Sequence, residues 1–97
     1  MKIIPLSAVP SQTMTVILNG QNCNISVYTL GEDNILYLDL LVQNKPIIQC
    51  VICHDRVRLI REPYLGFVGD LAFFDTQGTS DPVYSGLGSR YLLGYLT

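Results

Sequence analysis

Alternating apolar and polar residues mark the first strand of this chain. Along residues 12–18 the methionine, valine and leucine point one way, while the threonines point the other. This period of two is the pattern of a half-buried strand. Asn19-Gly20 follows, and this dipeptide favours a two-residue type I′ turn, in which both residues need a positive φ. The pattern therefore predicts a hairpin that returns through residues 23–30.

Further short apolar runs follow at intervals of roughly 8–12 residues, which is typical of an all-β domain. Residues 47–53 are apolar at nearly every position, which predicts a strand covered on both faces. Residues 57–60 are either a short strand or the continuation of that strand past a bulge. The further strands are expected at residues 35–42, 47–53, 71–74 and 90–96. No segment predicts a helix, so the fold is a small antiparallel β-barrel or sandwich of six to seven strands.

Two segments of this single domain, residues 1–97, fall outside the strand pattern. Residues 1–12 contain Pro5 and Pro10, which prevent a continuous central strand. This extended segment either lies across a neighbouring subunit or covers one end of its own domain. Residues 75–88 form a loop rich in glycine, proline and aspartate. A loop this long in so small a domain is a candidate functional segment.

Composition narrows the possible functions. The 97 residues are 48% hydrophobic and only 14% charged, which excludes a disordered chain. A net charge of −2 gives no basic field for specific nucleic-acid binding. No apolar run is long enough for a membrane-spanning helix, and the N-terminus lacks the pattern of a secretory signal. A domain with so few charged residues is expected to have much of its surface buried against protein partners.

Cys50, Cys53 and His54 form a C-x-x-C-H sequence, the attachment pattern of c-type haem. Here it ends an apolar strand, where residues three apart face opposite sides. Both thiols could then not reach one porphyrin, and the same geometry argues against a redox pair. A zinc site would need further ligands, with only Cys23 left among the cysteines. We therefore expect buried free cysteines, with no metal and no cofactor.

The sequence contains no constellation typical of an enzyme. It lacks a G-x-S-x-G nucleophile motif and has a single histidine, so we expect no catalytic residues. Its one concentration of charge is Arg56, Arg58 and Arg61, of which the first two are expected on one side of a strand. These arginines form either a docking stripe for a partner or a solvated face with internal ion pairs to Asp55 and Glu62.

An ordered series of motifs resembles the small baseplate plug family of contractile-tailed bacteriophages, named for the plug in a cyanophage tail. The resemblance extends over essentially the whole chain. The motifs are Ile4-Pro5-Leu6-Ser7-Ala8-Val9-Pro10-Ser11-Gln12-Thr13, Tyr37-Leu38-Asp39-Leu40, Tyr64-Leu65-Gly66-Phe67, Gly69-Asp70-Leu71, Asp75-Thr76-Gln77-Gly78, Asp81-Pro82 and Gly86-Leu87-Gly88-Ser89-Arg90-Tyr91.

This resemblance implies a structural virion protein of the central tail baseplate, assembled in the host cytoplasm. Such a plug would fill or seal the distal tail tube and contact the hub, the spike and the tape-measure end within a multi-subunit complex. The alternative is a generic small β-barrel module that binds a peptide, an oligosaccharide or nucleic acid. From the residues themselves, the candidate partner contacts are Arg56, Arg58, Arg61, Asp81, Tyr84, Arg90, Pro5 and Pro10.

Overall fold

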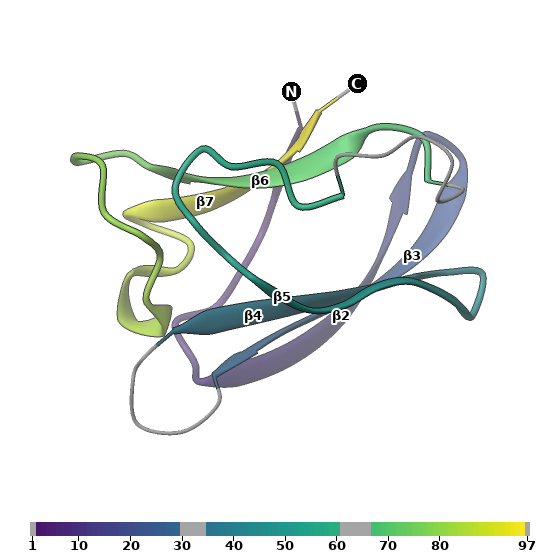
Figure 1. Cartoon of the computed structure of the whole chain (residues 1–97), viewed down its shortest axis with the longest axis horizontal. Coiled ribbons are helices and arrows are strands. Elements are labelled where there is room, and N and C mark those ends of the chain that lie inside the picture. Colours follow the sequence, from purple (N-terminus) through teal and green to yellow (C-terminus); the bar gives the residue numbers. More distant parts are fainter. Residues whose placement is uncertain (1, 30–34, 61–66, 97) are drawn as a thin grey trace.

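Seven strands form two antiparallel sheets that pack face to face, as the computed structural model shows for residues 2–29, 35–60 and 67–96 (Figure 1). One sheet has the order β1-β7-β6 and the other β2-β3-β4-β5. The all-β prediction is confirmed, and in the described part of the chain the sheets form a sandwich rather than a closed barrel. The elements are β1 (Lys2–Ile4), β2 (Ser11–Leu18), β3 (Gln21–Thr29), β4 (Leu36–Val42), β5 (Lys45–Ile52), β6 (Asp70–Asp75), a 3-10 turn (Tyr84–Gly86) and β7 (Tyr91–Leu96).

The predicted first hairpin is confirmed. Asn19 and Gly20 connect β2 to β3 with φ angles of 51° and 75°, the positive values that a type I′ turn requires. A second two-residue turn joins β4 to β5, where Gln43 and Asn44 have φ angles of 51° and 66°. The local sequence therefore determines these two turns of the four-stranded sheet.

The N-terminal strand β1 was not predicted. Lys2 and Ile4 pair with Tyr95 and Leu93 of β7, so the start of the chain completes the three-stranded sheet of its own domain. Three residues are too few to show a period, and Pro5 ends the strand. Residues 5–10 lie outside the strands, as the two prolines predicted, and cross to the other sheet.

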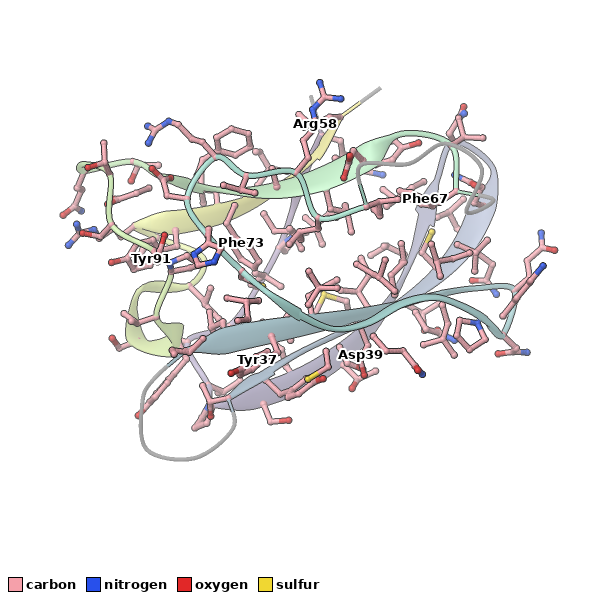
Figure 2. The ribbon with its side chains drawn as sticks, viewed as in Figure 1. Tyr37, Asp39, Arg58, Phe67, Phe73 and Tyr91 are labelled. Atoms are coloured by element: carbon pink, nitrogen blue, oxygen red, sulfur yellow. The ribbon has the colours of Figure 1, made fainter. Side chains whose placement is uncertain are left out.

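The core lies between the two sheets. Figure 2 shows Phe73 between them, whereas Tyr37 and Asp39 lie on the outer face of the four-stranded sheet. Alternate residues of β2, β3 and β4 point inward, which is the arrangement expected of a sandwich. The fully buried inward side chains include Leu18, Cys23, Ile25, Val27, Leu36, Leu38, Leu40, Leu71, Phe73 and Leu93.

Strand β5 is exposed on its outer side, so the prediction of a strand covered on both faces is wrong. It is an edge strand of the four-stranded sheet, and Ile52 at its end is 43% exposed. A bulge interrupts its pairing with β4, and Cys50 at that point has a φ of 54°. The Asp39 carboxylate accepts a hydrogen bond from the Cys50 backbone N–H at 2.7 Å. The bulge breaks the alternation, and an edge position leaves apolar residues at the surface.

Residues 57–60 are not a strand, so that prediction is also wrong. Arg56 adopts a φ of 57°, a left-handed conformation that interrupts any extended run. The segment instead follows the edge of β6 irregularly. Its backbone N–H groups at Arg56 and Leu59 donate to the carbonyls of Phe73 (2.7 Å) and Leu71 (2.9 Å). Arg56 and Arg58 therefore do not share a strand face, and Arg61 lies outside the described residues.

In the described part of the chain, no helix has the length and apolar character that crossing a membrane requires.

Candidate functional site: the loop end of the sandwich

One end of the sandwich, at the left in Figure 1, carries the predicted loop. We call this region the loop end and define it as residues 75–88 together with Ile35 and residues 52–56. Within the loop, only Tyr84–Gly86 form a regular element, a single 3-10 turn. A loop with so little secondary structure needs side-chain contacts to hold it.

Asp75, the last residue of β6, organises the loop. Its buried carboxylate accepts hydrogen bonds from Nε and Nη2 of Arg90, each at 2.9 Å. It also accepts the backbone N–H groups of Gln77 (2.9 Å) and Ser80 (2.8 Å). The Arg90 guanidinium holds the pKa of the Asp75 carboxyl well below its usual range, with the two backbone N–H groups adding to the effect. One carboxylate thus fixes both ends of the loop.

A second set of contacts holds the loop from its outer side. The Asp75 backbone N–H donates to Oδ1 of Asp55 at 2.8 Å, and the other Asp55 oxygen is bound by Nη1 of Arg56. Arg56 also donates to the carbonyls of Gly78 (3.1 Å) and Asp75 (3.2 Å). Its guanidinium therefore braces the loop, and its ion pair with Asp55 is the internal pairing considered from the sequence.

Asp81 and His54 join the far part of the loop to the end of β5. Nδ1 of His54 lies 3.0 Å from Oδ2 of Asp81, and the Asp55 backbone N–H donates to Oδ1 of Asp81 at 3.0 Å. The hydrogen bond from the Asp55 backbone N–H lowers the pKa of the Asp81 carboxyl, and the hydrogen bond to His54 adds a smaller effect in the same direction. Both side chains are about half exposed, so this pair presents polar groups at the surface.

An apolar pocket of about 290 Å³ opens beside this pair. Ile35, which is 37% exposed, and Ile52 are its exposed apolar lining residues. Such a concave apolar site with few polar groups suits a partner's apolar side chain. The complete lining is Ile35, Ile52, Cys53, His54, Asp81, Pro82 and Val83.

Among the candidate contacts, Arg56, Asp81 and Tyr84 lie in the loop end, and Arg90 binds its Asp75. Tyr84 is half-buried against the core. The others lie apart: Arg58 extends outward (Figure 2), Pro5 and Pro10 are exposed outside the loop end, and Arg61 lies outside the described residues. The central role of Asp75 was not predicted, although the Asp75-Thr76-Gln77-Gly78 motif carried a signal for a side-chain-capped turn.

The N-terminal segment reaches the loop end through one close contact. Gly88 has a φ of 82°, and a Cβ added there would lie 2.3 Å from the Leu6 carbonyl oxygen. The backbone at Leu6 therefore passes directly against the end of the loop. The N-terminal segment thus packs against the end of the loop in its own domain.

The three cysteines differ in exposure. Cys23 and Cys53 are buried, and burial raises the pKa of both thiols, that of Cys53 to about 12. Cys50 is exposed, so the expectation that it is buried is wrong, because the bulge turns it out of the sheet. The expected placement of the C-x-x-C thiols on opposite sides is confirmed. Within residues 2–29, 35–60 and 67–96, no three potential metal ligands form a cluster.

Comparison with known families assigns the chain as a whole. Residues 1–97 match the family described as cyanophage baseplate Pam3 plug gp18. The chain belongs to this family of cyanophage baseplate plugs. It is accordingly a structural component of the virion tail baseplate and associates with other baseplate components in a multi-subunit assembly. The structural role of the baseplate plug family favours a non-enzymatic protein. A search of curated proteins found no significant match.

Proposed function

We propose that this plug fills or seals the distal end of the tail tube, with its loop end seated against the hub and spike. Assembly would take place in the host cytoplasm, where the plug joins the hub, the spike and the tape-measure end. The observation that supports this most directly is the preorganised loop end beside an apolar pocket. Family membership over the whole chain supplies the baseplate setting.

Preorganisation matters because ordering a loop on binding costs free energy. The 75–88 loop is already fixed through Asp75, which is bound by Arg90 and by two backbone N–H groups of the loop. Arg56 adds a brace from outside. A partner therefore meets a formed surface, which suits a component that has to seat in a fixed place.

The chemistry of the loop end resembles the core and rim of a protein interface. Exposed Ile35 and Ile52 border the apolar pocket, and the Asp81–His54 pair lies at its rim. Stable interfaces combine an apolar centre with a polar margin. Enclosure by neighbouring subunits would also explain why only 14% of the residues are charged, because a surface buried against protein needs few charges.

An Ile52→Glu variant tests the loop end. Ile52 is exposed, so the fold should persist, whereas a charge beside the pocket should prevent seating of an apolar partner group. We expect the variant to lose co-purification with hub and spike proteins and to reduce assembly of infectious tails. The matched control is Val68→Glu, a similarly exposed apolar residue (54%) outside the loop end.

The two variants are matched, since each places one carboxylate at an exposed apolar position. They should nevertheless differ clearly, because only Ile52 lines the pocket. Normal tail assembly with Ile52→Glu, or equal loss with Val68→Glu, would contradict a specific role for the loop end. Circular dichroism on both purified variants separates loss of binding from loss of fold.

A further inference from the structure

The outer edge of β2 is an open strand edge. β2 is the last strand of the four-stranded sheet, and within the described residues no strand pairs with its other side. The Thr29 N–H donates to the Pro10 carbonyl at 3.0 Å, which sets the phase of the β2–β3 ladder. Even-numbered residues of β2 therefore bond to β3, and odd-numbered ones turn their N–H and C=O groups outward.

These outward groups form a regular template. Residues 11–18 contain no proline, no charge and no bulge, and their pairing with β3 is continuous. The Lys2 ammonium donates to this edge at its end, 3.4 Å from the Ile17 carbonyl oxygen. Proteins normally protect such an edge with charges, proline or a bulge, because it can pair with another chain.

The opposite edge of the same sheet has all of these protections. β5 begins with Lys45 and Pro46, and its bulge at Cys50 breaks the ladder. One edge of the sheet is thus protected and the other is open. This asymmetry indicates that the β2 edge is covered in the working protein.

The inward side chains of β2 are incompletely covered. Met14 and Val16 are only half-buried, although both pack against the core, and their neighbours Cys23 and Ile25 on β3 are fully buried. On the outer face, Ile17 is 58% exposed. A strand added beside β2 would continue the core past Met14 and Val16 and cover their exposed sides.

We propose that the occupant is β2 of a second copy of this chain, paired antiparallel about a two-fold axis at Met14. In this register Thr13 faces Thr15 of the second copy, and Ser11 faces Ile17. Every outward residue of β2 is then engaged, and each pair exchanges two hydrogen bonds. The register also keeps inward side chains beside inward ones, which a shift by one residue would not.

Side-chain chemistry favours a second copy over a charged partner. Thr13 and Thr15 already bond across to β3, with Oγ1 of Thr13 3.0 Å from the Ser26 hydroxyl and Oγ1 of Thr15 donating to the Asn24 side-chain oxygen at 2.7 Å. Pairing two such strands brings hydroxyls beside hydroxyls, with no like charges opposed. Cross-strand threonine pairs of this kind stabilise antiparallel sheets.

The test compares Thr15→Pro with Thr15→Val. Both variants lose the hydroxyl contact to Asn24, but only proline also removes the outward backbone N–H. By sedimentation equilibrium, we expect the wild type and Thr15→Val to dimerise and Thr15→Pro to dimerise at least about tenfold more weakly. A monomeric wild type, or equal dimerisation of both variants, would overturn the proposal.

A second measurement covers the case in which Thr15→Pro fails to fold. Amide hydrogen exchange of the wild-type protein should show the Thr13 and Thr15 N–H groups protected at high protein concentration and exchanging fast on dilution. Protection that does not change with concentration would also overturn the proposal. Neither outcome depends on the loop end, so this test is separate from that of Ile52→Glu.

Discussion

Replacing Gly88 with alanine probes the contact that joins the N-terminal segment to the loop end. Gly88 has a φ of 82°, and its position against the Leu6 carbonyl leaves no room for a Cβ. Gly20 provides a matched control. It has a φ of 75°, nearly the same backbone conformation, but nothing lies within 4 Å of the position that a Cβ would take there. The difference between the two alanine variants therefore isolates the steric contact.

The expected magnitude follows from two contributions. The left-handed backbone costs an alanine about 1–2 kcal/mol at either position. At Gly88 the new Cβ would also lie 2.3 Å from a backbone oxygen, more than 1 Å inside the 3.4 Å at which ordinary contact begins. The Leu6 backbone must move, and partial loss of its half-buried side-chain packing costs about 1–2 kcal/mol more. We therefore expect about 1–2 kcal/mol for Gly20→Ala and about 2–4 kcal/mol for Gly88→Ala.

Thermal unfolding followed by circular dichroism measures this difference. For a domain of this size, each kcal/mol shifts Tm by roughly 4–8 °C, so Gly88→Ala should melt about 4–16 °C below Gly20→Ala. Equal Tm values for the two variants would show that the Leu6 backbone does not pack against Gly88, and the proposed link between the N-terminal segment and the loop end would then be wrong.

The remaining predictions concern titration and thiol chemistry. Because the folded-state pKa of Asp75 lies below its unfolded value, the stability it contributes is complete above a pH of about 4 and is lost as the pH falls further. Urea unfolding at a series of pH values should therefore show a flatter acid dependence for Asp75→Asn than for the wild type, and identical slopes would contradict the role of Arg90. A thiol reagent should modify Cys50 in the folded protein and reach Cys23 and Cys53 only after unfolding, whereas equal rates for all three would contradict their burial.

Local features of the fold could be predicted from the sequence because their causes are local. The Asn19-Gly20 turn follows from the φ angles that these residues accept, and the alternation of residues 12–18 determines which side chains of β2 face the core. The strand β1 could not be predicted, because three residues show no period and their partner, β7, lies at the other end of the chain.

The mistakes at β5 and at residues 57–60 have a common physical cause. An apolar run shows that a segment avoids water, but not whether it lies at the centre or the edge of a sheet. The positive φ angles at Cys50 and Arg56 then change where the following residues point, and neither residue type signals this in advance.

The sequence indicated which segment is a candidate site, but not which contacts hold that segment in place. The length and composition of the 75–88 loop made it a candidate segment; Arg56 and Asp81 lie in the loop end, and Arg90 binds its Asp75. Arg90 binds Asp75, 15 positions earlier, and Arg56 binds the Gly78 carbonyl, 22 positions later. Contacts over such separations depend on the folded chain, so the sequence could not show that the arginines brace the loop.

A reconstruction of assembled tails by electron microscopy is the decisive test of where this plug lies and how it is oriented. We predict a seven-stranded sandwich in the lumen at the distal end of the tail tube, with the 75–88 loop and Ile52 against the hub and spike. A sandwich located on the outer rim of the baseplate, or one in the lumen with its loop end facing solvent, would show that the proposed function is wrong.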